Sequence, residues 1–288
     1  MIYLLYNPQS NNKHNDINII FKGKGSYDVK AISLIENDPT DIVKQLTPED
    51  KLLLCGGDGT ISRFATNTYG YDFPCPVCVL KSGTGNDFVR DINENETEKI
   101  EKLIDIRPYL KNLPTVEVNG IKARFINGVG FGIDGEVCRV ADEQKKKSNK
   151  KINYTAIALK LLAGGYKLPN AKVTVDGVTR EYKRVWLASA MKGRYYGGGM
   201  MVSPTQDRTS DVFSVMIFYG KTRAKALSVF PSIYKGGHIK HKEMVDIFEA
   251  KHVTVEFDRP LALQIDGETV LDVTTYTAYM DSHKTAND

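Results

Sequence analysis

Short apolar runs alternate with helix-compatible segments over the first 110 residues. The pattern predicts strands at 2–6, 28–34, 51–55 and 77–80, and helices at 40–47, 61–68 and about 95–105. The first of these helices follows Asp38-Pro39-Thr40, a polar cap and a proline typical of a helix start. Strands that alternate with helices indicate a parallel sheet. We therefore expect an N-terminal α/β domain over residues 1–113.

From about residue 113, apolar and polar residues alternate with a period of two. Strands are predicted at 115–118, 171–175, 185–190, 212–219, 253–257 and 261–265. Asp176-Gly177 predicts a tight hairpin turn. One helix is expected at 152–162, where apolar residues recur at helical spacing. Regular short strands of this kind favour a C-terminal antiparallel β-sandwich domain, over residues 114–288.

Composition narrows the class of protein. The 288 residues are 41% hydrophobic and 26% charged, with a net charge of +4 and a pI of about 8.6. This mild basic balance argues against a dedicated nucleic-acid binder. The first eight residues read as a strand and a turn, without the features of a signal peptide. No apolar run is long enough to span a membrane. We expect a cytoplasmic protein without a transmembrane segment.

Two glycine loops follow neighbouring predicted strands. Gly56-Gly57-Asp58-Gly59-Thr60 comes after the strand at 51–55, and Gly83-Thr84-Gly85-Asn86-Asp87 comes after the strand at 77–80. Glycine lets a backbone approach a bulky anion, with N–H groups and a helix N-terminus directed at it. Two such loops at one sheet edge predict a nucleotide-binding site in the α/β domain.

Other motifs fail on their context. Gly220-Lys221-Thr222 ends like a P-loop but lacks the leading glycine. The segment Gly130 to Gly135 fits the dinucleotide fingerprint, yet no acidic residue occurs at 150–160, so we interpret it as a turn. Cys75 and Cys78 have metal-site spacing without a second pair, and we interpret Cys78 as a buried residue of its strand. His238 and His241 lack a third ligand and are expected at the surface.

The order of the motifs resembles one family of kinases. It comprises the opening Asn7-Pro8-Gln9-Ser10, the two glycine loops, Gly197-Gly198-Gly199-Met200 and Asp266-Gly267-Glu268. The chain resembles the diacylglycerol kinase catalytic family, which includes bacterial soluble lipid kinases and the sphingosine and ceramide kinases. The resemblance extends from residue 2 to about 280. It implies a nucleotide-binding α/β domain followed by a β-sandwich, and an ATP-dependent, magnesium-requiring lipid kinase.

The resemblance also implies the nucleotide site. Asn7 and Ser10 would meet the nucleotide from the first turn. Gly56, Gly57, Gly59 and Thr60 would surround the phosphates, and Asp58 would hold Mg²⁺ directly or through water. Gly83, Thr84, Gly85, Asn86 and Asp87 would line the other side. Either Asp266 or Glu268 would be the base that accepts the proton of the lipid hydroxyl, a role that suits a carboxylate in a partly closed cleft.

A second metal site is implied less directly. In bacterial relatives an acid in a turn of the sandwich binds magnesium, linked to an acid that Asp134 matches here. Asp211 is the best match for the turn acid, but Val212 replaces the expected glycine. An ordinary solvated aspartate is the alternative interpretation. Asn11 and Lys81 also depart from the family pattern.

The basic stretch at 145–151 has two interpretations. It contains Lys145, Lys146, Lys147, Lys150 and Lys151, which would attract an anionic membrane surface where a lipid substrate resides. The alternative is a solvated loop before the helix at 152. Two other functions stay open, namely a soluble-substrate kinase of the NAD kinase type and a non-catalytic nucleotide-binding regulator. A homodimer is also left open.

Overall fold

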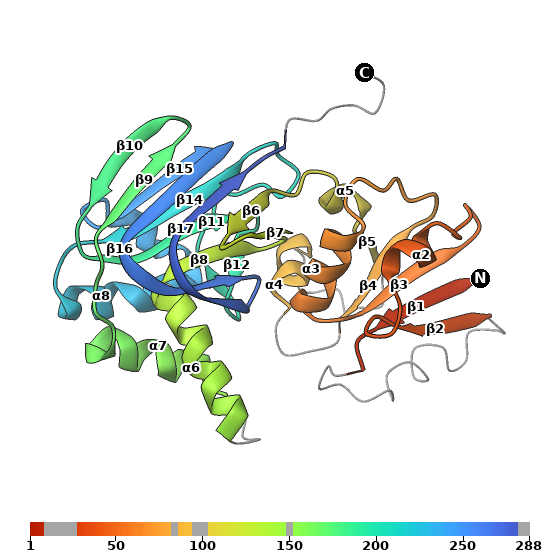
Figure 1. Ribbon diagram of the computed structural model, residues 1–288, viewed down its shortest axis with the longest axis horizontal. Coiled ribbons are helices and arrows are strands. Elements are labelled where there is room, and N and C mark those ends of the chain that lie inside the picture. The colour runs from red at the N-terminus through yellow and green to blue at the C-terminus, as the bar shows by residue number, and fades with distance from the viewer. Residues whose placement is uncertain (9–27, 82–85, 94–102, 148–151, 282–288) are drawn as a thin grey trace. The chain divides into compact units, whose positions relative to one another are not determined.

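The chain forms two compact units, Met1–Lys111 and Asn112–Asp288. The computed structural model describes residues 1–8, 28–81, 86–93, 103–147 and 152–281. Each unit is described by itself below, and Figure 1 labels its elements.

Unit 1 contains a five-stranded sheet in the order β2-β1-β3-β4-β5. Its strands are β1 (Ile2–Tyr6), β2 (Val29–Ser33), β3 (Lys51–Gly56), β4 (Val77–Lys81) and β5 (Ile104–Asp105). Its helices are α2 (Pro39–Val43), α3 (Asp58–Asn67), α4 (Asp87–Ile92) and α5 (Arg107–Leu110). β1 to β4 are parallel, and β5 runs antiparallel to β4. The predicted parallel α/β architecture is confirmed.

A local signal explains the start of α2, and the end of another predicted helix needs a correction. Asp38 caps α2, because its carboxylate accepts the backbone N–H of Thr40 at 2.9 Å and Pro39 occupies the first turn. The helix predicted at 95–105 is wrong at its end: residues 104–105 form β5, whose Ile104 pairs with Val79 of β4. The remainder of that prediction, at 95–102, lies outside the described residues.

Unit 2 is built on a ten-stranded antiparallel sheet that folds into a β-sandwich. Its strands are β6 (Thr115–Val118), β7 (Ile121–Arg124), β8 (Gly128–Gly132), β9 (Ala171–Val175), β10 (Val178–Tyr182), β11 (Val185–Met191), β14 (Phe213–Tyr219), β15 (Val245–Ala250), β16 (His252–Ile265) and β17 (Glu268–Tyr279). β12 (Tyr195–Tyr196) and β13 (Met200–Met201) form a separate pair. The predicted antiparallel sandwich is confirmed, including the hairpin at Asp176-Gly177.

The long strand β16 joins the two parts of the sandwich. Its first half pairs with β9, as in Val255 with Val173, and its second half pairs with β8, as in Leu263 with Phe131. β17 pairs with β16 over most of its length. The register of β16 and β17 shifts between residues 256 and 263, and such irregularities bend a strand. One strand can therefore serve both parts of the sheet.

Helices cover one face of the sheet of unit 2. They are α6 (Ile133–Lys147), α7 (Tyr154–Lys160), the π-helix η1 (Leu161–Gly165), α8 (Arg223–Val229), and the 3₁₀ segments η2 (Phe230–Lys235) and η3 (Gly237–Lys240). α6 and α7 pack together beneath the sheet in Figure 1. Because both faces of β11 and β14 are covered, β11 is buried throughout and β14 at every residue but its last.

Helix α6 corrects two predictions from the sequence. The segment Gly130 to Gly135 is not a turn, because Gly130 and Gly132 belong to β8 and Gly135 lies in the first turn of α6. Lys145, Lys146 and Lys147 are not in a loop but form the last turn of α6, where positive charge complements the helix dipole. The predicted helix at 152–162 begins at Tyr154 and continues as a π-helix to Gly165.

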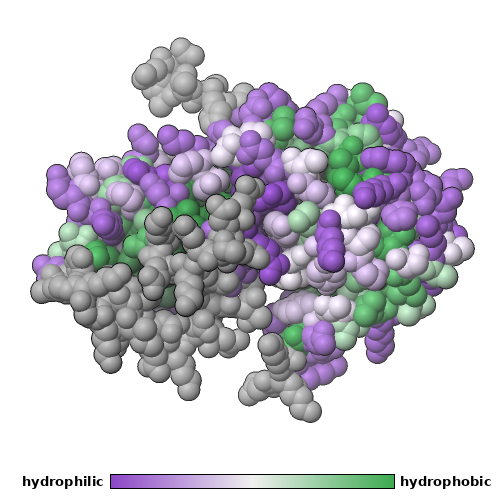
Figure 2. Space-filling model, turned by 180° about the vertical axis from the view of Figure 1, so that it is seen from behind, coloured by the Kyte–Doolittle hydropathy of each residue, from purple (hydrophilic) through white to green (hydrophobic). Residues whose placement is uncertain are grey.

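Exposed apolar residues are dispersed over unit 2. Val178 and Leu271 are each 53% exposed, and they lie on different hairpins. Figure 2 shows apolar residues in separate patches among polar ones on the face of unit 2 that it presents. Dispersed residues of this kind are ordinary on a protein surface. Among the described residues, no helix combines the length and the apolar character needed to cross a membrane.

Candidate functional site

The first glycine motif is shorter as a loop than the sequence predicted. Gly56 ends β3, Gly57 is the N-cap, and Asp58, Gly59 and Thr60 already belong to α3. A β-carbon on Gly56 would lie 2.3 Å from Oγ1 of Thr60, so only glycine fits there. In the first turn of α3 the N–H of Thr60 already donates to the carbonyl of Gly57 at 3.0 Å. The N–H groups before it have no carbonyl within the helix to donate to, as at any helix start, and can donate to an anion.

Asp58 links the two glycine motifs of unit 1. Its Oδ2 accepts the backbone N–H of Asp87 at 2.9 Å, and its Oδ1 accepts that of Phe88 at 3.0 Å. These amides begin α4, so the carboxylate stabilises the N-terminus of a second helix. β3 and β4 are neighbours in parallel register, with Gly56 beside Lys81. The described parts of the two motifs, Gly56–Thr60 and Asn86-Asp87, therefore meet at one sheet edge, as the sequence predicts.

The other predicted nucleotide residues are placed only in part. Asn7 follows β1 and is partly exposed, Asn86 is the N-cap of α4, and Asp87 is 4% exposed. Asp87 forms an ion pair with Arg90 one turn along the helix, at 3.9 Å. Ser10, Gly83, Thr84 and Gly85 lie outside the described residues, as does Asn11. The nucleotide roles of all these residues stay predictions.

Asp266 anchors the turn between β16 and β17. Its two carboxylate oxygens accept the backbone N–H groups of Ile126, Asn127 and Gly128 at 2.7 to 3.0 Å. In return, the amide of Asp266 donates to the carbonyl of Gly128 at 3.0 Å. The residue adopts a φ of +47°, which aspartate tolerates in turns. Asp266 therefore fixes the segment before β8 against the hairpin.

Glu268 stands in the same turn with a different environment. It is exposed and begins β17. The turn around it is held at both sides: the amide of Gly267 donates to Oε1 of Gln264 at 2.7 Å, and the hydroxyl of Thr269 donates to Asp142 of α6 at 2.8 Å. An exposed carboxylate on a fixed turn is available to a bound molecule.

Asp134 is a buried acid in the first turn of α6. It is 8% exposed, its Oδ2 accepts from Nε2 of Gln264 at 3.4 Å, and its Oδ1 has no hydrogen-bond partner among the described residues. Burial raises the pKa of this carboxyl to about 6, against the opposing effect of the Gly135 amide and Gln264. Gln264 thus connects Asp134 to the turn that bears Glu268.

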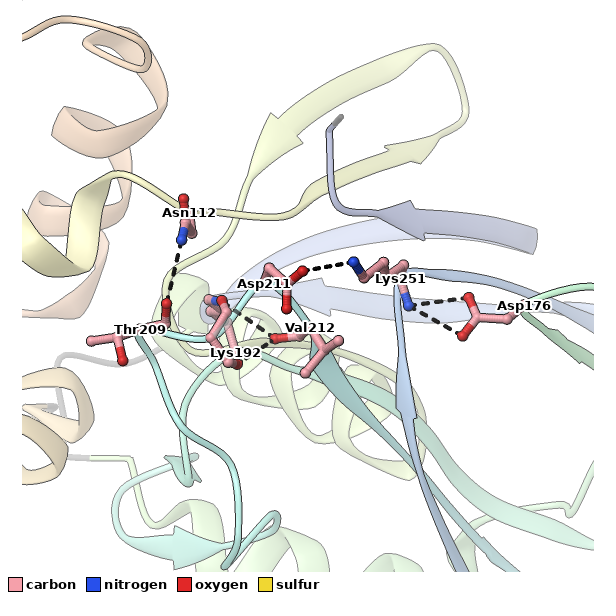
Figure 3. A network of polar contacts seen from close by, with 8 residues as sticks. Asn112, Asp176, Lys192, Thr209, Asp211, Val212 and Lys251 are labelled. Atoms are coloured by element: carbon pink, nitrogen blue, oxygen red, sulfur yellow. Dashed lines mark hydrogen bonds and ion pairs between the residues drawn. The ribbon is translucent and has the colours of Figure 1, made fainter. Parts of the chain in front are cut away.

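Asp211 has a cationic partner within unit 2. Its Oδ2 pairs with Nζ of Lys251 at 2.6 Å, which lowers the pKa of the carboxyl. Figure 3 shows this pair beside Lys192, whose Nζ donates to the carbonyl oxygens of Ser210 and Val212. Asp134 has different contacts, and among the described residues no three acidic, histidine or cysteine side chains could together hold a metal ion. Asp211 and its surroundings do not fit the implied magnesium site.

The structure also shows two charged residues, Lys192 and Arg208, whose burial the sequence did not predict. Lys192 is 1% exposed, and burial lowers its pKa to about 8. Arg208 is 6% exposed and donates to the carbonyl of Ile126 and, at 2.5 Å, to Oδ1 of Asn127. Lys192 directly follows the apolar run of β11, a position that could have suggested burial.

One histidine prediction is wrong. His238 is not at the surface but 3% exposed, with Nε2 3.0 Å from the carbonyl oxygen of Val202. Burial lowers the pKa of His238 below its ordinary value. His241 lies close to Glu243, with Nδ1 3.5 Å from Oε1. The two histidines therefore have different partners.

Unit 1 is a parallel α/β unit with glycine motifs at a sheet edge, and unit 2 is an antiparallel sandwich. This combination can be compared with the known families of two-domain kinases. The diacylglycerol kinase catalytic domain matches residues 1–113, and the YegS C-terminal NAD kinase beta sandwich-like domain matches residues 127–280. The chain belongs to the family of lipid kinases that these two domains define.

Individual proteins show the same similarity. The chain is 28% identical over 211 residues to a diacylglycerol kinase of Mycobacterium tuberculosis, covering 72% of this chain and 67% of that protein. It is 25% identical over 289 residues to a Staphylococcus epidermidis protein whose name provisionally assigns it as a lipid kinase, covering 93% and 90%. A crystal structure of a diacylglycerol kinase from Bacillus anthracis matches the fold with a TM-score of 0.62 at 19% identity, covering 96% and 93%.

Proposed function

We propose that this protein is an ATP-dependent kinase that phosphorylates a lipid hydroxyl, most simply that of diacylglycerol. The observation that supports the proposal best is the position of Asp58, which joins the starts of α3 and α4. Phosphoryl transfer depends on positioning phosphates and stabilising their charge. The start of α3 would supply N–H groups for this purpose, while Asp58 uses the first amides of α4 to hold the two helix starts together.

The residues of unit 1 would hold the nucleotide. Gly56 and Gly57 let the backbone approach the phosphates, and the N-terminus of α3 would face their negative charge. Each oxygen of Asp58 accepts one N–H and retains a lone pair that can accept from a metal-bound water, so Asp58 fits an indirect magnesium contact. A bound Mg²⁺ would neutralise the charge that develops on the transferred phosphoryl group.

We assign the base in unit 2 to Glu268. Asp266 already accepts three backbone N–H groups, and hydrogen bonds of this kind stabilise the ionised form and weaken a carboxylate as a base. Glu268 is exposed on a turn that Gln264 and Asp142 hold in place. It would accept the proton of the lipid hydroxyl as the oxygen attacks the terminal phosphorus of ATP.

The lipid would be reached by peripheral attachment from the cytoplasm. Lys145, Lys146 and Lys147 form an exposed cationic end of α6. Tyr154 and Leu159 of the neighbouring α7 are 40% and 41% exposed. Cations beside exposed apolar side chains are suited to an anionic lipid surface.

A kinase assay tests this function. Labelled ATP and Mg²⁺ are supplied with a panel of lipids in mixed micelles, with diacylglycerol included, and with NAD as a soluble acceptor. We expect label in a lipid product and its loss in Asp58→Asn, with Asp72→Asn as an exposed control on the same unit. Label in NADP instead would favour a kinase of the NAD kinase type. Nucleotide binding without transfer to any acceptor would favour a regulator.

A further inference from the structure

The turn at residues 206–212 brings several oxygen atoms together, as the binding site of a hard cation does. It presents the carbonyl oxygens of Ser210 and Val212 together with the carboxylates of Asp207 and Asp211. Carbonyl and carboxylate oxygens are the ligands preferred by Mg²⁺ and Ca²⁺. The negative charge of these oxygens must be compensated by a cation or by hydrogen-bond donors.

Cationic side chains already engage the turn. Nζ of Lys192 donates to the carbonyl of Ser210 at 2.5 Å and to that of Val212 at 3.3 Å. Nζ of Lys251 pairs with Asp211 at 2.6 Å, as Figure 3 shows. Lys251 is itself held, since its backbone N–H donates to Asp176 at 3.1 Å. A divalent ion at this place would be repelled by two ammonium groups.

Other oxygens of the turn are engaged as well. The carboxylate of Asp207 accepts from the amide and the hydroxyl of Thr209, at 2.8 and 2.7 Å. Nε2 of Gln206 donates to the carbonyls of Asp207 and Val212, at 2.8 and 3.1 Å. Asn112, the first residue of unit 2, donates to the carbonyl of Thr209 at 3.3 Å. Protein donors therefore engage the carbonyl oxygens of Asp207, Thr209, Ser210 and Val212 and one carboxylate oxygen each of Asp207 and Asp211.

We infer that the buried ammonium of Lys192, with Lys251 on the outer side, holds the 206–212 turn in place of a divalent cation, so that unit 2 folds independently of magnesium. The two lysines differ in burial: Lys192 is 1% exposed, whereas the side chain of Lys251 is 61% exposed. Loss of the buried ammonium leaves carbonyl groups without a donor, and this is costly away from water. Loss of an exposed ion pair changes stability little.

Thermal unfolding of the full chain without nucleotide tests the inference. We expect the midpoint of the wild type to be the same in excess Mg²⁺ and in excess EDTA. Lys192→Met should lower the midpoint by several degrees, and added Mg²⁺ should not restore it. Lys251→Met is the matched control and should lower it much less.

Binding of Mn²⁺ gives a second measurement that does not depend on whether Lys192→Met folds. We expect electron paramagnetic resonance to detect no Mn²⁺ ion at Asp211 in the wild type without nucleotide. The spectra of the wild type and of Asp211→Asn with Mn²⁺ should therefore be the same. A bound Mn²⁺ that disappears in Asp211→Asn would overturn the inference. An EDTA-induced fall in the wild-type midpoint, or equal effects of the two lysine variants, would also overturn it.

Discussion

Gly130 and Asp134 lie so close that a β-carbon on residue 130 would stand 1.3 Å from Oδ2 of Asp134. Gly130 is an ordinary strand residue of β8 without a positive φ, so space and not conformation requires glycine. The first turn of α6 brings the acid against the strand from which the helix emerges. Glycine at this position allows a carboxyl group to be buried there.

Alanine at position 130 should destabilise unit 2. The new methyl group would overlap Asp134 and would also lie 2.8 Å from Nε2 of Gln264, so both buried side chains would have to move. We expect Gly130→Ala to lower the free energy of unfolding by about 1–3 kcal/mol, the usual cost of overpacking. Urea unfolding measures it. Gly164→Ala is the control, since no atom lies within 4 Å of its added carbon. Equal stability of the two variants would contradict the prediction.

Asp134 should make stability depend on pH. Its pKa is about 6 in the folded protein and near 3.9 in an unfolded chain. Between these values Asp134 binds more protons in the folded state than in the unfolded chain. The stability that its protonated carboxyl contributes is therefore fully present below pH 4 and is lost as the pH rises through 6. Asp134→Asn should match the wild type at pH 4 and exceed it at pH 8, by on the order of 2–3 kcal/mol. Parallel stability curves between pH 4 and 8 would refute this account.

Substitution of Asp266 should lower the stability of the protein, whereas substitution of Glu268 should lower its turnover. Asp266→Asn weakens the acceptor of three backbone N–H groups, and we expect a loss of about 2–3 kcal/mol in the free energy of unfolding. Glu268→Gln should unfold like the wild type and lose turnover by a factor on the order of 10² to 10⁴. Circular dichroism and the lipid kinase assay measure the two effects. A stable Asp266→Asn protein without turnover, beside an active Glu268→Gln, would assign the base to Asp266.

The lysines at the end of α6 should govern attachment to anionic vesicles. Each lysine near a charged surface contributes about 1 kcal/mol, so replacing Lys145, Lys146 and Lys147 with Gln should weaken binding by about two orders of magnitude. Vesicle sedimentation at two salt concentrations measures this, and the wild-type affinity should fall as salt rises. Replacement of the exposed Lys172, Lys183 and Lys221 is the matched control. Equal losses in both triple variants would point to general charge attraction instead of a defined contact.

The strands and the first glycine motif could be predicted because their signals are local. Apolar residues of β1, β3 and β4 form short uninterrupted runs, and β9 alternates with a period of two. Helix α6 was missed because glycines at 130, 132 and 135 hide its apolar spacing, although Ile133, Val137 and Ala141 recur every four residues. The low helix propensity of Gly135, the one of these glycines that lies in α6, was outweighed by packing against the sheet.

The contacts that define the candidate site could not be predicted from spacing. Asp266 and Ile126 are separated by 140 residues, and only the pairing of β16 with β8 brings them together. The burial of Lys192 had only a weak signal, its place after the apolar run of β11, because a lysine after a strand is ordinarily solvated. Both features depend on the tertiary arrangement of unit 2.

The pairing of β16 with β8 also determines when the protein can fold during synthesis. Unit 1 has β1 to β4 complete once 81 residues have emerged from the ribosome. In unit 2, Val129 of β8 cannot pair with β16 until Ile265 has been synthesised. Val116 of β6 cannot pair with β17 until Ala278 has been synthesised. Such distant pairings form slowly and leave apolar strand edges exposed meanwhile. The nascent chain should therefore emerge with β1 to β4 of the first unit complete, while β8 and β6 of the second unit each lack one strand neighbour until β16 and β17 have been synthesised.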